Sequence, residues 1–460
     1  MPLDDTTRKQ VHLGAYFPGV NHYTVWADPR SGSQIDIDSF LHYVRTAERG
    51  RFDFFFQAEG LRVRERKGRF YENDVAGRPD ILTLQAALSG ATTHLGLLAT
   101  INATFNEPYE LARTLASLDH LSEGRAGWNV VTTSDAFHGA NFRRGGYLPR
   151  EERYERAAEV LAAAGGLWDS WTGGGSGEFA HHGRHVDIEG VFPVPTSPQR
   201  HPVLFQAGDS GEGRDFAVRN ADAVFTFWRG LEGGRAFVAD LAARATRAGR
   251  DPETLRVLPG LTVVLGDTEA EALDNAREVT RAQVTPATAL VLLEQTWQRD
   301  LSGFDPDGPP PAPQDAPEVE NLVAGRTIQS ADLQRRAQEW YAEAVERGLS
   351  IRELVIAKSG QQAMAGTPQQ VADRIDEAVQ TGASDGFIIS PTIVPHGLDE
   401  FVDRVVPLLQ ERGSLRTEYP EGATFRELLG LPERAPFAQP GVARFSAADS
   451  VPTDAERRAG

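Results

Sequence analysis

Short apolar runs alternate with longer amphipathic segments along most of the chain. The runs are rich in β-branched, aromatic and small residues, and most precede a segment with helical hydrophobic spacing, such as Glu110–Leu121 or Tyr154–Leu167. The eight predicted strands are Val11–Phe17, Phe52–Ala58, Leu95–Ala103, Ala126–Thr133, Pro202–Ala207, Ala223–Phe227, Val257–Leu265 and Gly386–Ser390. This alternation indicates a parallel sheet, and eight strands favour a closed barrel over an open sheet. The pattern therefore predicts an α/β protein with a (β/α)8 TIM barrel.

Two stretches do not fit a minimal barrel. Residues Ser302–Glu320 are rich in proline and acidic side chains, which neither a helix nor a central strand tolerates, so they predict a long loop. This loop is either a mobile lid or a plain surface insertion. The last residues include few large apolar side chains, and we expect them to be extended over the surface or frayed. We therefore expect one barrel domain over residues 1–434 and a C-terminal extension over residues 435–460.

Composition and charge exclude several classes of protein. The chain has 460 residues and no cysteine, which excludes disulfides, thiolate metal sites, iron–sulfur clusters and cysteine nucleophiles. No segment approaches the roughly 18 uncharged residues of a membrane span. A formal net charge of −18 repels phosphate backbones and anionic lipid surfaces. We expect a cytoplasmic protein that binds neither nucleic acid nor a membrane.

Two clusters of polar residues indicate other ligands at first sight. Five basic residues between positions 62 and 69 are interrupted by an acid; they predict a solvated loop, with contact to an anionic ligand as the alternative. Four histidines lie in and after a glycine-rich connection. They are His181, His182, His185 and His201. No carboxylate stands at ligand spacing from them, so we expect a hydrated hairpin or loop and no metal site.

The C-terminal ends of the predicted strands are the places to look for chemistry, because a parallel barrel has its active site there. Glu59 follows the second strand, and it could be a base, a hydrogen-bond acceptor for a cofactor or the partner of an arginine. Asn102 and Thr104 stand at the end of the third strand. Asn129 lies in the apolar fourth strand, where its carboxamide needs a partner. That partner is either the polar edge of a ligand or neighbouring backbone.

The end of the fifth strand carries the segment QAGDSGEGRDFA. Its small residues, including Gly208, and Ser210 stand before a helix that is predicted to begin near Gly211. Free backbone N–H groups and the helix dipole favour a phosphate there, although a simple tight turn with an N-cap would have the same sequence. The spacing matches neither the dinucleotide fingerprint nor the Walker loop. With Arg214 the nearest basic residue, the segment suits a single phosphate monoester better than a triphosphate.

Long segments of the chain resemble a known family. They are Asn106–Thr133, Asn141-Phe142, ERYERAAEVL from Glu152, LWDSW from Leu167, SPQRHPVLFQAGDSGEGRDFA, AGTPQQVADRIDEAV, GASDGFIISPTIVPHGLDEFVDRVVPLLQERG and RTEY. Together they resemble the nitrilotriacetate monooxygenase, dibenzothiophene-sulfone monooxygenase and pristinamycin synthase group of luciferase-like proteins. The similarity covers nearly the whole chain and rests on long ordered segments.

The resemblance implies a TIM barrel with insertions that acts as the oxygenase component of a two-component flavin-dependent monooxygenase. A separate NAD(P)H:flavin reductase would supply FMN as FMNH2. The reaction with O2 would give a C4a-hydroperoxyflavin, which the protein shields until it oxygenates a small organic substrate. Related barrels commonly pair, so we expect a homodimer or homotetramer. The alternatives are an F420-dependent oxidoreductase of the same fold and a non-catalytic flavin-binding barrel.

By the same resemblance, the family's flavin contacts map onto residues at the strand ends. They are Glu59, Asn102 or Thr104, Asn129, Arg150, Tyr154 and Ser210, with Gly208 in the phosphate loop. The family usually has aspartate at Glu59, histidine at Arg150 and glycine at Arg143. Arg150 could give the flavin phosphate a charge-assisted contact, and the longer Glu59 must reposition its carboxylate.

The catalytic residue is not identified by the sequence, because this chemistry needs a shielded cavity rather than a fixed triad. Four residues are candidates for the lining of the substrate side. They are His22, Tyr23, Trp26 and His138. A surface or structural role is the alternative for His138, since a lone histidine on a loop is weak evidence.

Overall fold

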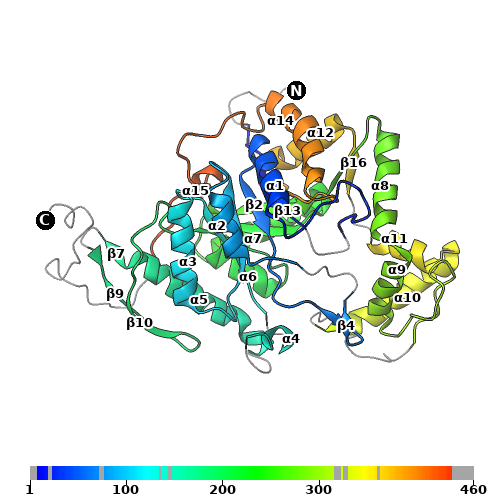
Figure 1. Ribbon diagram of the computed structural model, residues 1–460, viewed down its shortest axis with the longest axis horizontal. Helices are drawn as coiled ribbons and strands as arrows, with labels where there is room; N and C mark the ends of the chain where they lie inside the picture. The colour runs from blue at the N-terminus through cyan, green and yellow to red at the C-terminus, as the bar shows by residue number, and fades with distance from the viewer. Residues whose placement is uncertain are drawn as a thin grey trace.

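Eight parallel strands close into a barrel that is surrounded by helices (Figure 1). The computed structural model describes residues 8–18, 23–71, 77–133, 136–142, 148–172, 175–314, 323–324, 330–359 and 363–437. The barrel strands are β1 (His12–Tyr16), β2 (Phe54–Gln57), β5 (Gly96–Asn102), β6 (Ala126–Val131), β11 (Val203–Gln206), β12 (Ala223–Phe227), β13 (Arg256–Leu261) and β17 (Gly386–Ile389). Their order around the barrel is β1-β17-β13-β12-β11-β6-β5-β2. The predicted (β/α)8 barrel is confirmed.

Helices cover the outer face of the barrel, which is why its strands are nearly continuous apolar runs rather than alternating ones. The covering helices are α1 (Ile37–Arg49), α2 (Ile81–Ser89), α3 (Pro108–Leu121), α5 (Arg153–Asp169), α6 (Gly211–Asn220), α7 (Gly230–Arg247), α12 (Pro368–Gln380), α13 (Asp399–Arg404) and α14 (Val406–Glu411). Both predicted helices are present, as α3 and α5. Helix α1 is typical of the layer: it buries Phe40, Tyr43 and Val44 in the same cluster as strand residues Leu13 and Phe55.

The N-terminal end of the barrel is filled by a short helix from near the end of the chain, α15 (Phe425–Leu428). The Phe425 ring is fully buried, with its centroid 5.5 Å from that of Phe54 and 6.1 Å from that of Phe205. Gly96 and Gly127 make room for it, because a Cβ on either would lie 2.6 or 2.7 Å from atoms of the Phe425 ring. This plug leaves the C-terminal mouth of the barrel as the end where a site can form.

Adding one methyl group at Gly127 should destabilise the protein through this plug. The Cβ of Gly127→Ala would also lie 3.0 Å from Leu98, so we expect a loss of about 1–3 kcal/mol in the free energy of unfolding, measured in urea. Gly303→Ala is the matched control, since its Cβ would have no heavy atom within 4 Å. Equal stability of the two variants would contradict this packing.

The predicted strand Val257–Leu265 is wrong in its length. The chain leaves the barrel after Leu261, and β14 (Val263–Leu265) pairs instead with β16 (Met364–Gly366) in a separate two-stranded sheet. The amide of Met364 donates to the carbonyl of Thr262 (2.8 Å) at the point of departure. The apolar pattern continues through both strands, so hydrophobicity alone gave no sign of the break.

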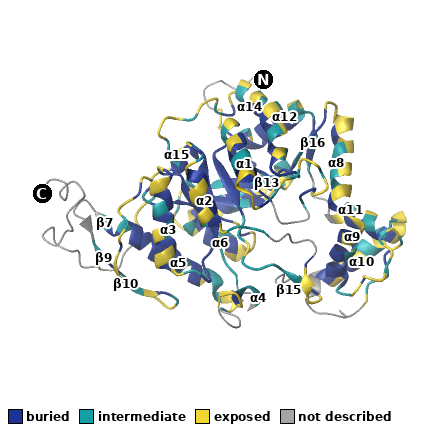
Figure 2. Ribbon diagram, viewed as in Figure 1, coloured by how far each residue is buried: buried dark blue, intermediate teal, exposed yellow. Residues whose placement is uncertain are grey.

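Four helices between β14 and β16 stand at one side of the barrel (Figure 1). They are α8 (Glu269–Gln283), α9 (Pro286–Trp297), α10 (Ser330–Arg347) and α11 (Ile351–Ser359). Figure 2 shows buried residues where α9, α10 and α11 meet, and these form a cluster of their own that includes Leu293, Trp297, Ile351 and Leu354. The single-domain assignment of residues 1–434 stays a prediction.

The predicted long loop joins α9 to α10. Residues 302–314 contain no helix or strand, as expected, and residues 315–320 lie outside the described part. The loop is fastened to the helices by three hydrogen bonds: Ile351 N–H to Gly308 O (2.9 Å), Arg352 N–H to Pro306 O (2.9 Å), and Trp297 Nε1–H to Pro311 O (2.8 Å). Residues 302–314 thus lie against α9 and α11.

The basic cluster after β2 is not simply a solvated loop, which corrects the prediction. It forms β3 (Glu65–Arg66) and β4 (Arg69–Phe70), which share a sheet with β15 (Val323–Ala324). The buried Arg66 guanidinium pairs with Glu294 of α9, and Lys67 reaches the same carboxylate at 3.1 Å. A buried carboxylate needs such partners. Glu294 is far from this cluster in sequence, so the local pattern around Arg66 could not indicate the pairing.

Smaller features of the described residues lie outside the barrel. They include the hairpin β9 (Glu178–His182)/β10 (Asp187–Val191), the pair β7 (Trp171–Thr172)/β8 (Gly175–Ser176) and helix α4 (Ala136–Gly139). The predicted C-terminal extension begins packed: the Phe437 amide donates to Asp169 (2.7 Å), while residues 438–460 lie outside the described part. No described helix is both long and apolar enough to cross a membrane.

Candidate functional site at the barrel mouth

Asn102 and Thr104 shape the rim between β5 and β6. The Asn102 Oδ1 accepts hydrogen bonds from the backbone amides of Thr104 (2.7 Å) and Phe105 (3.3 Å). The Thr104 hydroxyl accepts from the Thr133 amide after β6 (3.1 Å). Both side chains are buried. Their polar groups therefore hold the turn after β5, and any contact with a ligand comes in addition to that role.

Asn129 is the residue of this group whose hydrogen bonding is incomplete. Its side chain is 3% exposed, and its Nδ2 donates to the Thr100 hydroxyl of β5 (3.1 Å). Its Oδ1 is buried and has no hydrogen-bond partner within the described residues. A buried acceptor without a partner costs about 1–3 kcal/mol, so such atoms commonly mark a place for a water or a ligand donor. Neighbouring backbone, the alternative partner for this amide, does not satisfy it.

Glu59 lies just beyond β2 in a half-buried position. Burial raises the pKa of its carboxyl to about 8, and the nearby Asp80 carboxylate adds to this effect. The backbone amide of Asn102, which hydrogen-bonds the carboxyl, and the Arg78 guanidinium act in the opposite direction. Glu59 is therefore mostly protonated at neutral pH, which makes it a hydrogen-bond donor as well as an acceptor.

Tyr16 and Arg78 belong to the same group, and the sequence analysis missed both. Arg78 donates to the carbonyl oxygen of Glu59 (2.5 Å). Burial raises the pKa of the Tyr16 phenol. The nearby Tyr23 also raises it, whereas the Arg78 guanidinium lowers it. Tyr16 is the last residue of β1, so the strand-end rule could have found it. Arg78 stands in the segment before α2, where nothing in the local pattern indicates a site.

The start of α6 is exposed at Gly211 and Glu212. Ser210 is the N-cap and accepts from the Gly213 amide (3.1 Å), and a Cβ on Gly211 would meet nothing within 4 Å. Gly208 allows the loop after β11 to pack closely against the first turn of α6, because a Cβ there would lie 2.7 Å from the Cα of Gly213. The hydroxyl of Tyr154 lies against the same turn, 2.9 Å from where a Cβ of Gly213 would be. The turn thus brings together β11, α5 and α6, and phosphate binding at it stays a prediction.

The basic residues near this turn already have carboxylate partners. Arg214 pairs with Asp209 (3.1 Å) and Asp240 (2.9 Å), and Arg229 pairs with Asp209 (2.5 Å). An anion here would therefore be held mainly by backbone N–H groups and the helix dipole, which suits one phosphate monoester. Arg150 begins a short 3-10 turn at Arg150–Glu152, and its side chain lies outside the described part.

The substrate-side candidates are only partly brought together. Tyr23 lies beside Tyr16, and its carbonyl accepts from Gln283 of α8 (2.6 Å). His138 lies in α4, which docks on the segment after β2 through the Arg62 guanidinium, bound to the Phe137 carbonyl at 2.8 Å. Trp26 is 36% exposed. His22 lies outside the described residues.

The histidine connection forms the predicted hairpin, but the reason given against a metal was wrong. Helix α5 supplies two carboxylates: Glu155 lies 3.5 Å from His185 and Glu159 lies 3.8 Å from His181. Glu159 also accepts three backbone amides, from residues 184, 185 and 186, at 3.2, 2.8 and 3.0 Å. These carboxylates come from a different element, so spacing along the connection could not reveal them.

Comparison with known proteins agrees with the barrel fold. The model of a family described as luciferase-like monooxygenase matches residues 20–385. The chain is 38% identical to nitrilotriacetate monooxygenase component A of Aminobacter aminovorans and 37% identical to N-acetyl-S-(2-succino)cysteine monooxygenase of Bacillus subtilis (strain 168). Each alignment covers 92% of this chain and 97% of the relative.

Among solved structures, the EDTA monooxygenase EmoA from Chelativorans sp. BNC1 is similar over nearly its whole length. The TM-score is 0.72 at 30% sequence identity, and the match covers 94% of this chain and 100% of that one. The residues flanking the mouth therefore fall within a scaffold that the two chains share.

Proposed function

Because the chain belongs to the luciferase-like monooxygenase family, we propose that it is the oxygenase component of a two-component flavin-dependent monooxygenase, which uses reduced FMN and O2 to oxygenate a small organic substrate. The observation that carries the cofactor assignment is the buried, unpartnered Oδ1 of Asn129 at the barrel mouth. A flavin ring has N–H groups that satisfy such an acceptor. The residues present therefore fit the cofactor.

The ring and the phosphate have separate positions in this proposal. Asn129 and Glu59 would hold polar edges of the ring, while the open turn at Ser210 and Gly211 would take the phosphate, with Tyr154 beside it. When bound, reduced FMN supplies two electrons that, with O2, put one oxygen atom into the substrate and the other into water. The protonated Glu59 carboxyl can hold a proton at the ring without adding charge. The packed barrel interior below would close the site to water from that side.

The partners follow from the same proposal. A diffusible reductase that uses NAD(P)H would supply the reduced flavin, and the relative named as component A of a nitrilotriacetate monooxygenase supports a second component. We also propose a homodimer or homotetramer. The two relatives at 38% and 37% identity are named for polycarboxylates, so nitrilotriacetate and N-acetyl-S-(2-succino)cysteine are the first compounds to try.

The proposal is tested by supplying the protein with FMNH2 from an added reductase in the presence of isotopically labelled O2. We expect a product that has gained one labelled oxygen atom. Consumption of reduced F420 with no label in the product would indicate the F420-dependent alternative. Release of hydrogen peroxide alone, whatever substrate is offered, would indicate the non-catalytic flavin-binding barrel.

The substitution Ser210→Asp tests the phosphate position. Aspartate keeps the N-cap of α6, so the fold should be retained, but it places a carboxylate beside the phosphate. We expect the affinity for FMN to fall about tenfold or more, by charge repulsion. The affinity for riboflavin, which lacks the phosphate, should be unchanged and serves as the control. An equal loss for both flavins would place the phosphate elsewhere.

A further inference from the structure

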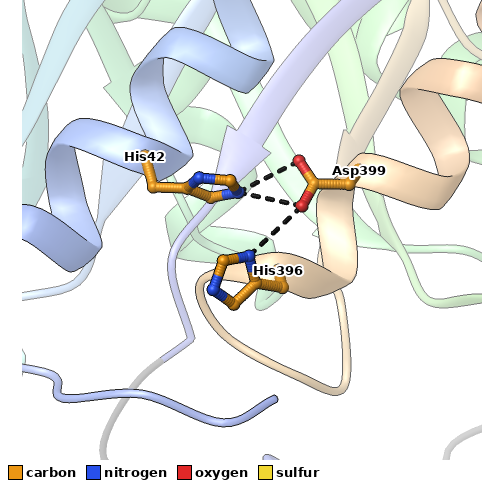
Figure 3. Close-up of side chains that lie close together, drawn as sticks. All are labelled: His42, His396 and Asp399. Atoms are coloured by element: carbon orange, nitrogen blue, oxygen red, sulfur yellow. Dashed lines mark hydrogen bonds and ion pairs between the residues drawn. The ribbon is translucent and has the colours of Figure 1, made fainter.

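Two histidines and one aspartate meet on the outer wall of the barrel, from two segments that are distant in sequence: His42 on one side, His396 and Asp399 on the other (Figure 3). His42 comes from α1, His396 from the 3-10 turn His396–Leu398, and Asp399 from the first residue of α13. Figure 3 shows both rings turned toward the carboxylate. None of the three takes part in the site described above.

The three candidate ligands of this cluster lie close together. The His42 Nε2 lies 2.9 Å from the Asp399 Oδ2, and the His396 Nδ1 lies 3.4 Å from the same oxygen. The ring centroids are 4.2 Å apart, and one ligand atom from each residue lies within 4.8 Å of the others. Four ligands at about 2.0–2.1 Å from a tetrahedral ion stand about 3.3 Å apart. Little movement would therefore be needed to admit an ion.

We propose that His42, His396 and Asp399 bind one divalent transition-metal cation such as Zn²⁺. Imidazole nitrogens and a carboxylate are ligands that Zn²⁺ and its neighbours prefer, whereas Mg²⁺ and Ca²⁺ need oxygen ligands. The two histidine side chains are 37% and 47% exposed, which leaves a path for the ion and a fourth position for water.

The surroundings of Asp399 support this assignment. The Thr46 hydroxyl, one turn after His42, donates to the Asp399 Oδ1 (2.7 Å) and so holds the carboxylate in place, with Oδ1 3.1 Å and Oδ2 2.9 Å from the His42 Nε2. Such outer hydrogen bonds orient metal ligands and strengthen binding. The Arg49 guanidinium lies 3.9 Å from Oδ1, but it also pairs with Asp403, which offsets its charge.

The position of the cluster gives the ion a structural effect. Helix α1 follows β1 and the 3-10 turn follows β17, and these strands are neighbours at the seam where the first and last strands of the barrel meet. An ion bound there would link the segments that follow the first and the last strand of the barrel. Because the unfolded chain does not hold the three ligands together, binding stabilises the folded state.

Within the described residues, Glu155, Glu159 and His185 form a second group of side chains that could bind a metal ion. It fits an ion less well, because the Glu159 carboxylate already accepts three backbone amides and Arg184 pairs with Glu155 at 3.2 Å. It provides the matched control.

The experiment uses the untagged full-length protein after treatment with a chelator. Titration calorimetry with Zn²⁺ should show one equivalent bound and a higher melting temperature. His42→Ala and His396→Ala should each weaken binding at least about tenfold, as should the outer variant Thr46→Val, while His185→Ala should bind like the wild type. Added Co²⁺ should give a visible absorption band in the wild type that both histidine variants lack.

Circular dichroism checks that each variant is folded, and Asp399→Asn replaces any variant that is not. The proposal is overturned if the wild type takes up no Zn²⁺ in this titration. It is equally overturned if His42→Ala and His396→Ala bind as tightly as the wild type, or if His185→Ala alone removes the bound ion.

Discussion

Replacing Asn129 by leucine is expected to weaken the binding of reduced FMN by about 10- to 100-fold and to leave the fold at least as stable as in the wild type. The loss of binding follows from removing a buried acceptor that the flavin would satisfy, worth about 1–3 kcal/mol. Stability should not fall, because relief of the buried oxygen that is unpaired without ligand outweighs the lost hydrogen bond from Nδ2 to Thr100, and leucine has the same branched shape as asparagine. Fluorescence titration and urea unfolding measure the two effects.

Gln57→Leu is the matched control for this experiment. The Gln57 Oε1 is also buried and unpartnered, and the side chain belongs to β2. It follows Phe56, which faces the barrel interior, so it points to the outer side of the wall. We expect Gln57→Leu to be at least as stable as the wild type and to bind flavin with unchanged affinity. If both variants bind flavin like the wild type, Asn129 is not a flavin contact.

The barrel could be predicted from the sequence because its strands are buried on both faces and stand out as apolar runs between helical patterns. The same property hid the boundary at Thr262, where one apolar run serves two sheets. The plug at Phe425 was also missed. The Phe425 ring fits because Gly96 and Gly127 have no side chains at that point. Both glycines are far from Phe425 in sequence, and a missing side chain gives no hydrophobic pattern to recognise.

The candidate site could be predicted to the extent that it depends on strand ends. Asn129 and the turn at Ser210 are in position because barrel topology fixes where each strand stops. Arg78 could not be found this way, since it reaches Glu59 from the loop before α2. The pairing of Arg66 with Glu294 and that of His185 with Glu155 likewise join separate elements. Sequence supplies the ligand types, and the fold decides which of them meet.

Glu59→Gln is expected to make the flavin-free protein more stable than the wild type at alkaline pH, by about 1–3 kcal/mol, and nearly equal to it at acid pH. Burial raises the pKa of Glu59 to about 8, well above the value of about 4.3 in an unfolded chain. Between these values the unfolded wild type loses a proton that the folded state keeps, so its stability falls as pH rises and levels off above about 8. The partial exposure of the residue makes the effect smaller than the full shift would give.

Melting temperatures of both proteins from acid to alkaline pH measure this difference. Glutamine has the shape of the neutral acid and cannot ionise, so the gap between the curves should widen as pH rises from about 4 and stay constant above about 8. Glu159→Gln gives the opposite control: burial favours the neutral acid there, but three backbone amides outweigh it and lower the pKa of Glu159. That variant should be less stable than the wild type at neutral pH, and its deficit should shrink toward acid pH. A constant gap for Glu59→Gln would mean that Glu59 is ionised at neutral pH, and it could then hold no proton at the flavin.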